Sequence, residues 1–457
     1  MKQHTTIALF VLLAASMAYA GGPLIVGSPV LPNDGEPLVW NVATMPITYT
    51  VDPGPLAKTP NGTVVLDNAA GRARVQSLFA VWQAAPDAAL TFSDHGLIQV
   101  ADGDVNTIEE YNAISCTTNP IIFDANGSLF DELVGDPLVI GFAGPCAIDT
   151  HGHIAGAHAA LNGRFQDGLD ITGNSELTSD EFDTAFIHEF GHFLGLDHSQ
   201  INGRCLTSGV LCSDAELGGM PTMFPILIGD FMKSLATDDL AWISKLYPKA
   251  SFSTNYGTIS GTIFFSDGIT PAQGVNVIAR RVDDPTTPTE DESRTYAVSV
   301  VSGYRFTGNP GQSLTAHYLR CSPSSEVCSG YASNNVGGSS TGSRSPSLYG
   351  YFEMAVPPGN YTIEVESVRS AFTEGSSVGP LDPPVPMPGG TKEFWNDGES
   401  ATDSPSASTP ISVPAGGRVD NINVILNNTA ARNDSFETGW LLLPAIGFAQ
   451  NECEVRG

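Results

Sequence analysis

The sequence predicts two dissimilar folded parts. Residues 40–248 are expected to form an α/β (α+β) domain with a mixed twisted sheet and a metal-binding helix, and residues 251–428 an all-β sandwich. In the first part, a β-rich run, a long amphipathic segment and short strands precede a histidine-rich helix. Helical periodicity ends at Pro248, beyond which short alternating strands are separated by Gly, Ser, Thr and Pro.

Composition limits the classes of partner. The chain has 457 residues, 41% of them hydrophobic, which is enough for two or three domains with cores. Its net charge is −29 with only 20 basic residues, so repulsion argues against nucleic acid or an anionic membrane surface. This balance suits a soluble extracellular protein that binds calcium, and it equally suits an acidic surface that only maintains solubility.

Residues 1–20 are predicted to be a secretory signal peptide. Lys2 supplies the positive start, residues 7–15 the apolar core, and Ala18-Tyr-Ala20 the cleavage site. The apolar run is too short to span a membrane. We therefore expect a secreted, extracellular protein that is cleaved near Ala20 and has no membrane span. Residues 21–39 are rich in Pro and Gly and are expected to form an irregular N-terminal lead-in.

The first part is expected to begin with a strand at residues 47–51 and a helix over residues 67–84. Apolar side chains recur at helical spacing in that helix, at Val75, Leu78, Phe79 and Trp82. Short strands are predicted at 90–92 and 97–100. The last part of residues 149–161 alternates small and apolar side chains, which predicts an edge strand.

A loop between these elements has the start of a calcium-binding pattern. Asp124, Asn126 and Ser128 place oxygen atoms at alternate positions, as calcium loops do. The twelfth position of such a loop needs a glutamate, and Gly135 stands there. A turn with an Asn-Gly corner is the alternative interpretation.

A helix that begins at the capping box Thr178-Ser-Asp-Glu181 is predicted to carry the chemistry. His188 and His192 are four residues apart, so they share one face of the helix and can hold one zinc ion together. Gly195 follows, where a helix can end in a left-handed turn. That turn would bring His198 back as the third ligand.

Three protein nitrogens leave the fourth tetrahedral position open for water, which is typical of a catalytic rather than a structural zinc. Glu189 follows the first ligand, close enough to take a proton from a zinc-bound water. An amphipathic helix with two satisfied core histidines is the alternative. The glycine and third histidine at fixed spacing argue against it.

Residues 188–199 resemble the signature of the metzincin metallopeptidases, H-E-x-x-H-x-x-G-x-x-H. Within that clan they are most similar to the matrixins, with Ser199 included in the match. Met223, followed by Phe and Pro, resembles the Met-turn that forms an apolar floor beneath the zinc, and Met220 is the competing assignment. Residues 235–248 resemble the closing helix of the family, with Thr237 as the expected N-cap.

The resemblance implies a zinc endopeptidase that acts on protein or peptide substrates, with Glu189 as the general base and then the general acid. It also implies that the edge strand predicted within residues 149–161 pairs with an extended substrate. An apolar wall for the side chain after the cut is implied at residues 224–235. The rival function is a zinc-binding adhesion or scaffold protein that has lost activity. Hydrolysis of a non-peptide amide is a more distant alternative.

Many matrixins carry a second, structural zinc in the region that here contains His151, His153 and His158. The usual acidic partners are not in recognisable register, so solvent-exposed histidines are the alternative.

The second part contains strand patterns at residues 257–265, 274–279, 351–365 and 419–426. They resemble a carboxypeptidase regulatory-like β-sandwich of immunoglobulin type with long insertions. We find no catalytic constellation there and expect a spacer role or an unknown ligand. Residues 429–457 form a C-terminal tail whose role the sequence does not decide.

Seven cysteines fit an oxidising compartment. Proximity in the sequence suggests the pairs Cys116–Cys146, Cys205–Cys212 and Cys321–Cys328, and leaves Cys453 over. Sequence alone does not fix this connectivity.

Overall fold

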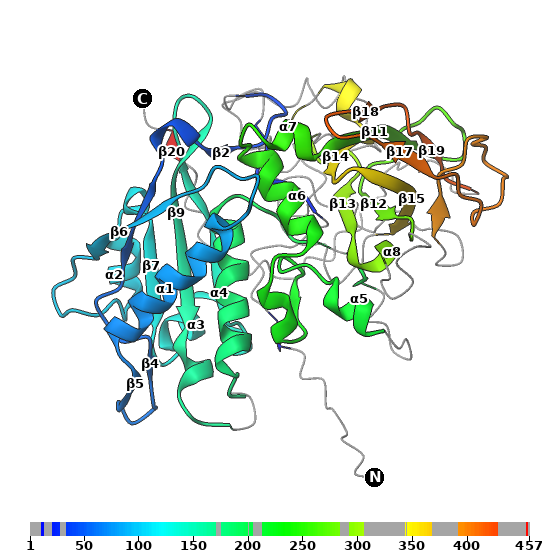
Figure 1. The fold of residues 1–457 in the computed structure, drawn as a ribbon. Helices are drawn as coiled ribbons and strands as arrows, with labels where there is room; N and C mark the ends of the chain where they lie inside the picture. Colours follow the sequence, from blue (N-terminus) through cyan, green and yellow to red (C-terminus); the bar gives the residue numbers. More distant parts are fainter. Residues whose placement is uncertain are drawn as a thin grey trace, which may run out of the picture.

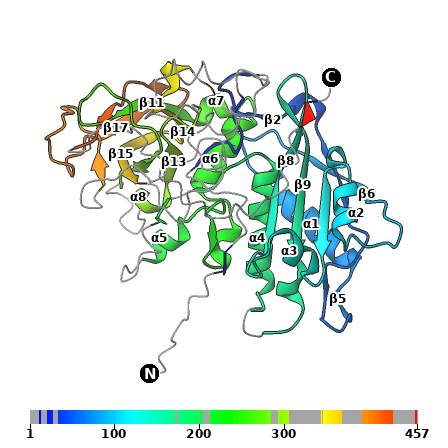
Figure 2. The ribbon, with the colours of Figure 1, turned by 180° about the vertical axis from the view of Figure 1, so that it is seen from behind.

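The structure is a computed structural model of the chain. It describes residues 11–12, 21–27, 33–170, 175–199, 201–203, 213–283, 292–305, 343, 345–367, 392–427 and 454–455. Figure 1 shows an α/β part beside an all-β part, with helix α6 (Thr237–Leu246) between them. The view from behind shows the same arrangement (Figure 2). The predicted mixed α/β architecture is confirmed, and the predicted domain bounds stay a prediction.

A seven-stranded sheet forms the first part. Its order is β20 (Glu454–Val455), β8 (Gly141–Ile148), β9 (His153–Asn162), β7 (Pro120–Asp124), β3 (Ile47–Val51) and β6 (Phe92–Leu97), and β2 (Val39–Trp40) also pairs with β9. Every described pair is parallel except β8 with β9, which is antiparallel. The sheet is therefore mixed, as expected.

Strand β9 lies inside this sheet, so the prediction of an edge strand at residues 149–161 is wrong. It pairs with β7 on one side and with β8 on the other. Its small side chains let both faces be covered, and Ala157, Ala159 and Ala160 are all 0% exposed. Strand β8, with only the two-residue β20 on its far side among the described strands, takes the outer position.

Helices α1 (Asn68–Gln83) and α4 (Ser179–Phe193) pack on each other and on the sheet. Phe79 of α1 stacks on Phe190 of α4 with ring centroids 3.8 Å apart. Trp82 Nε1 donates a hydrogen bond of 2.8 Å to the Ile187 carbonyl. The apolar face predicted for residues 67–84 thus packs against α4, the helix that carries His188 and His192 and that we call the ligand helix. Asp67 caps the start of α1.

One strand replaces the two short strands predicted at 90–92 and 97–100. Strand β6 runs from Phe92 to Leu97, and its register against β3 shifts between Tyr49 and Val51. Gly96 lies at this irregularity with φ of +103°. Glycine adopts that value without steric cost, so the strand continues through a bulge.

Shorter elements complete the first part. They are β1 (Val11–Leu12) paired with β10 (Ile226–Leu227), the hairpin β4 (Ala57–Lys58) and β5 (Val64–Leu66), helices α2 (Ile108–Ala113), α3 (Ser128–Leu133) and α5 (Asp214–Gly218), and the 3₁₀ turns η1 (Val42–Thr44), η2 (Cys116–Thr118), η3 (Gly163–Gln166) and η5 (Asp230–Lys233). No helix in the described ranges combines the length and apolar character that crossing a bilayer requires.

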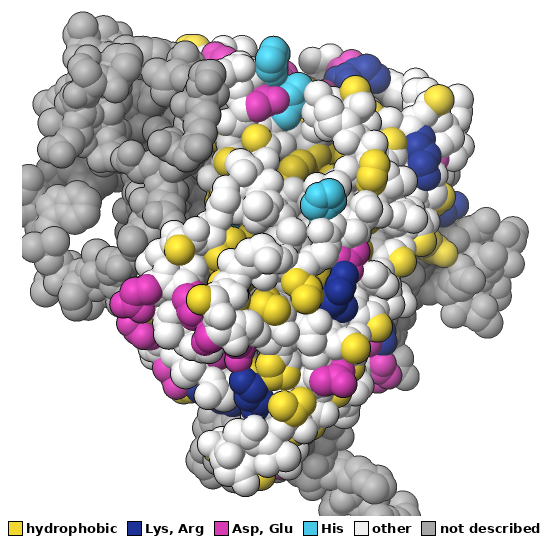
Figure 3. All heavy atoms as spheres, turned by 90° about the vertical axis from the view of Figure 1, so that its left-hand side faces the viewer, with side chains coloured by type: hydrophobic (Ala, Val, Ile, Leu, Met, Phe, Trp, Pro, Cys, Tyr) yellow, Lys and Arg dark blue, Asp and Glu magenta, His cyan; other side chains and the backbone are white. Residues whose placement is uncertain are grey.

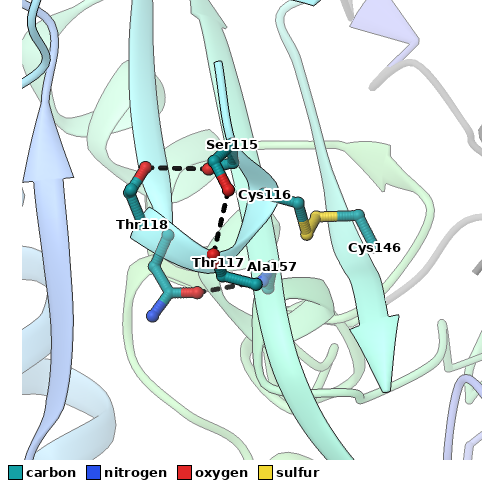
Figure 4. Close-up of a disulfide and its surroundings, with 7 residues drawn as sticks. Ser115, Cys116, Thr117, Thr118, Cys146 and Ala157 are labelled. Carbon is teal, nitrogen blue, oxygen red and sulfur yellow. Dashed lines mark hydrogen bonds between the residues drawn. A yellow bond between two sulfur atoms is a disulfide. The ribbon is translucent and has the colours of Figure 1, made fainter. Parts of the chain in front are cut away.

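A disulfide between Cys116 and Cys146 ties η2 to β8 (Figure 4), which confirms that predicted pair. It passes over β9 at Gly156, where a Cβ atom would lie 2.7 Å from the Cys116 sulfur. The pairs Cys205–Cys212 and Cys321–Cys328 and the leftover Cys453 lie outside the described residues.

Two sheets build the second part. One has the order β14 (Tyr351–Val356), β11 (Gly257–Phe264) and β18 (Arg418–Val419), with β19 (Val424–Ile425) also on β11. The other has β13 (Ala297–Val301), β12 (Val275–Arg281), β15 (Gly359–Ser367) and β16 (Glu393–Phe394), with β17 (Ile411–Val413) also on β15. Helices α7 (Phe252–Asn255) and α8 (Glu292–Thr295) and the turn η7 (Pro346–Leu348) lie between strands. The all-β expectation holds, and the immunoglobulin type stays a prediction.

The strand predicted at 419–426 is interrupted. Strands β18 and β19 both pair with β11 in parallel, separated by Asn421 with φ of +67°. The Asn423 side-chain oxygen accepts the backbone N–H of Thr262 at 2.9 Å. The Ile422 N–H bonds to the Ser260 carbonyl at 3.0 Å, so one backbone bond and one side-chain bond bridge the break. Period-two patterning cannot reveal this arrangement.

Helix α6 joins the two parts. Its N-cap is Ala236 rather than the predicted Thr237, and Asp239 accepts the Ala236 N–H at 2.8 Å. Trp242 of α6 packs edge-on against Tyr304 of the second part, with centroids 5.8 Å apart. One connected hydrophobic core includes side chains of both parts. The boundary near residue 250 therefore crosses a shared core.

Candidate metal centre

The structure brings the three predicted histidines to one point. Helix α4 carries His188 and His192, and the chain returns to add His198, with all three at most 3% exposed. The Nε2 atoms of His188 and His198 are 2.8 Å apart, and His192 Nε2 lies 3.1 Å from each. Within the described ranges, this is the cluster of histidine, cysteine and acidic side chains compact enough to hold a metal ion.

The predicted glycine turn delivers the third ligand. Gly195 has φ of +83°, and Leu196 N–H bonds to the Gly191 carbonyl at 2.9 Å, so helix α4 ends in a left-handed cap. Asp197 then accepts the N–H of His198 at 2.8 Å. The chain reverses within five residues because only glycine takes this turn without strain.

Two ligands have fixed tautomers. His188 Nδ1 lies 2.8 Å from the Thr222 carbonyl, and His192 Nδ1 lies 2.8 Å from the Leu196 carbonyl. A carbonyl oxygen only accepts, so both Nδ1 atoms carry the proton and each Nε2 presents a lone pair. Lone pairs held this close together repel each other unless a cation lies among them. The donor set therefore fits a metal ion.

Burial keeps the histidines neutral. It lowers the pKa of His192 to about 4, and it lowers the pKa values of His188 and His198 well below the usual range, with the neighbouring imidazoles adding to the effect there. Neutral imidazole is the form that binds metals.

Glu189 is buried beside the cluster without a partner. It is 1% exposed, and neither carboxylate oxygen has a hydrogen bond among the described residues. Burial raises the pKa of this carboxyl well above its usual value. Strand β8 passes directly over it at Gly141, where a Cβ atom would come within 2.8 Å of Glu189 Cγ. An unsatisfied buried carboxylate is costly, so its presence calls for a functional explanation.

Met223 lies beneath the ligand helix. It is 2% exposed in the main core, against Gly191 of α4. Met220 belongs instead to a separate apolar cluster with Phe224 and Met232. This placement favours Met223 over Met220 as the apolar floor.

The sequence missed how this floor is held. The Asp239 carboxylate accepts the N–H groups of Thr222 and Met223 at 2.8 and 3.0 Å. Thr222 is also the residue whose carbonyl orients His188. Two adjacent acids at a helix start predict only favourable helix-dipole interactions. Because the contact spans 16 and 17 residues, no local pattern reports it.

The predicted calcium ligands are engaged within their own loop. Asp124 accepts the Phe130 N–H at 2.7 Å, and Asn126 accepts the N–H and hydroxyl of Ser128 at 3.2 and 2.8 Å. The Arg164 guanidinium bonds to the Gly127 carbonyl at 2.8 Å. These contacts suit the Asn-Gly turn, and calcium binding here stays a prediction.

Histidine side chains also lie on the outer face of the first part, and Figure 3 shows some of them next to an acidic side chain at the top of that face. Asp149 lies 3.2 Å from His153 Nδ1 and 3.9 Å from His151 Nδ1, with the His151 side chain 79% exposed. His158 packs edge-on against Tyr111 and Phe142 instead. Asp149 is thus an acidic neighbour that the sequence did not identify, and a second zinc at His151 and His153 stays a prediction.

Comparison with known proteins does not place the chain in a family. No protein-family model matches it, and no curated protein matches it. One match among solved structures is titled "GM1 bound form of the ECX AB5 holotoxin", with 15% sequence identity and a TM-score of 0.24, covering 48% of this chain and 76% of that chain. A similarity at that TM-score supports no conclusion about fold or function.

Proposed function

We propose that this chain is a secreted zinc-dependent endopeptidase of the matrixin type, with a β-sandwich attached. The observation that carries the proposal is the unpartnered carboxylate of Glu189 beside three converging imidazoles. Structural zinc sites have four protein ligands, whereas this cluster offers three and places an acid beside them. Zinc reaches nitrogen ligands at about 2.0–2.1 Å, so one ion can contact all three Nε2 atoms.

Zinc bound by His188, His192 and His198 would supply Lewis-acid polarisation of a peptide carbonyl and a lowered pKa of water. Glu189 would accept the proton from the attacking water at a carboxylate oxygen and return it to the leaving amine nitrogen. Burial raises the pKa of this carboxyl, which makes it a better acceptor for that proton than an exposed glutamate would be.

Strand β8 is the surface that would orient the substrate. Its residues from Gly141 to Pro145 pair with β9 on one side and have no strand partner on the other among the described residues. An extended peptide can add to such an edge by backbone hydrogen bonds. Because Gly141 touches Glu189, a peptide on this edge would pass beside the acid.

The side chain after the cut would meet an apolar wall. Met220, Phe224 and Met232 form a buried cluster, with Ile226, Ile228 and Phe231 packed on it. We expect a preference for a hydrophobic residue at that position. A peptide library cleaved with no apolar preference there would contradict this part of the proposal.

The test compares purified wild type with Glu189→Gln on denatured protein substrates, with zinc content measured in both. We expect the variant to keep zinc and to lose about 10²–10⁴-fold in cleavage rate, the usual contribution of a general acid–base. The matched control is Glu109→Gln, at an exposed glutamate of α2, which should cleave like wild type.

Other outcomes separate the alternatives. A wild type that holds zinc and cuts nothing would favour the scaffold function. A Glu189→Gln variant as active as wild type would remove the assigned base. Absence of zinc from wild type would contradict the whole proposal.

A further inference from the structure

The third ligand lacks the anchor that the other two have. His188 and His192 each hold a backbone carbonyl through Nδ1 at 2.8 Å. His198 Nδ1 is buried and has no hydrogen-bond partner among the described residues. The direction of its ring therefore depends on the backbone of residues 195–199, which we call the ligand loop.

The ligand loop is held by the N-terminal segment of the chain. Leu24 N–H donates to the Gly195 carbonyl at 2.7 Å, and Asp197 N–H donates to the Gly22 carbonyl at 2.9 Å. Pro23 and Leu196 form an antiparallel bridge. Residues 21–24 of the predicted irregular lead-in therefore lie along the ligand loop like a short strand, and we call them the splint.

The same loop is held by the β-sandwich at its far end. Ser199 Oγ lies 3.4 Å from Ser299 Oγ of strand β13 and also bonds to the Asp238 carboxylate of α6. Asp238 accepts the N–H of Ser299 at 2.7 Å. Ser199 and Ser299 are 0% exposed and Asp238 is 2% exposed, so this polar cluster is sealed between the two parts.

The splint and the cluster touch each other. Gly21 lies against the Ser299 carbonyl, and that carbonyl accepts Trp242 Nε1–H at 2.8 Å. One residue of the sandwich therefore contacts α6, the splint and the ligand loop. A spacer domain needs no such set of buried contacts.

We propose that the β-sandwich helps to position a ligand of the metal centre. Ser299 of the sandwich and Asp238 of α6 are positioning residues that fix the orientation of His198 through the ligand loop. The inference rests on the proposed function only in that the histidine cluster holds zinc. Groups that orient ligands from outside typically change metal affinity by about 10–100-fold when they are removed.

The experiment measures the zinc dissociation constant by chelator competition for full-length Asp238→Ala, and the visible spectrum after cobalt(II) replaces zinc. We expect about 10-fold weaker zinc binding and an altered cobalt spectrum, because His198 is no longer held in register. Asp238→Asn should recover most of the affinity, since its amide still accepts from Ser299 and donates to Ser199.

Asp87→Ala is the matched control. Asp87 is also buried and also joins the two parts, accepting Asn255 Nδ2–H at 2.9 Å. Its hydrogen bonds to Asn255 and to the Lys249 N–H lead away from the ligand loop. We expect its zinc affinity and cobalt spectrum to match wild type. Equal losses in Asp87→Ala and Asp238→Ala would mean that affinity follows general stability, which would overturn the proposal.

If Asp238→Ala does not fold, the zinc affinity of Ser299→Ala tests the proposal instead. It removes only the hydroxyl facing Ser199, and Ser302→Ala is its control, removing a buried hydroxyl that bonds to the Ala272 carbonyl at 2.7 Å. A loss confined to Ser299→Ala supports the proposal, and equal affinities contradict it. If wild type binds zinc without cutting peptides, the proposed function fails while this inference is still decided by the affinities.

Discussion

Each part of the molecule buries a glutamate, and the two glutamates differ in their hydrogen-bond partners and in the direction of their pKa shifts. In the sandwich, Glu364 is 2% exposed and accepts bonds from Arg280 at 2.6 Å and Lys392 at 2.9 Å. Burial alone would raise the pKa of Glu364, and the two cations hold it below its usual value. Glu189 is equally buried, has no such partner, and has a raised pKa.

This difference shows how to separate structural from chemical charges. A buried charge with complete partners is explained by the fold. A buried carboxylate without a hydrogen-bond partner, beside three side chains that can bind a metal, is not stabilised by the fold. Such a group indicates a chemical role toward a bound metal or substrate.

The largest expected effect on stability comes from breaking the complete cluster. Glu364→Gln removes a buried anion that both Arg280 and Lys392 contact, and we expect a loss of about 3–5 kcal/mol in the free energy of unfolding. Glu189→Gln in metal-free protein should lose nothing, because no bond is broken. Urea unfolding measures the free energy of unfolding of both variants. Equal losses would contradict the expectation that only Glu364 stabilises the fold.

The sequence predicted what depends on local spacing. The positions of His188, His192 and Gly195 on one helix and its cap follow from helical geometry. The same holds for the apolar face of α1 and the alternating pattern of the long sandwich strands.

What failed depends on contacts between distant residues. Ser199 and Ser299 are 100 residues apart, and Asp238 meets Ser299 across 61. Whether β9 is an edge or a central strand is decided by its neighbours, since small residues suit both positions. The bulge at Gly96 and the break at Asn421 are backbone features that hydrophobic periodicity does not encode.

Two acids, one in each part, should also respond to pH with opposite signs. Burial raises the pKa of Asp52 to about 7, with Asp104 nearby adding to the effect. The folded chain therefore binds a proton that the unfolded chain releases above pH about 4. The stability from Asp52 is complete below that pH and is lost as pH rises to about 7, with a slope approaching about 1.4 kcal/mol per pH unit.

Glu353 of the sandwich should behave in the reverse way. Burial would raise its pKa, but Lys245 and then Arg418 hold it at about 2. Its stabilisation is complete above the unfolded value near 4.5 and is lost as pH falls toward 2. Subtracting the urea-unfolding curves of Asp52→Asn and Glu353→Gln from wild type isolates each group. Two differences with the same sign of slope would contradict the opposition.

The smallest expected effect concerns the start of the ligand helix. Thr178 Oγ1 accepts the Glu181 N–H at 3.2 Å, and Thr107 makes the same capping box on α2 with Glu110 at 3.3 Å. We expect Thr178→Ala and Thr107→Ala each to cost about 1 kcal/mol of stability by thermal or urea unfolding.

Their comparison also shows what sets the rotation of the ligand helix. Phe182, Phe186 and Phe190 of α4 are all 0% exposed, and Phe190 stacks on Phe79 of α1. Because that packing resists rotation along most of the helix, we expect zinc affinity to be unchanged in both variants. If Thr178→Ala weakened zinc binding while Thr107→Ala did not, the cap rather than the packing would be what aims His188 and His192.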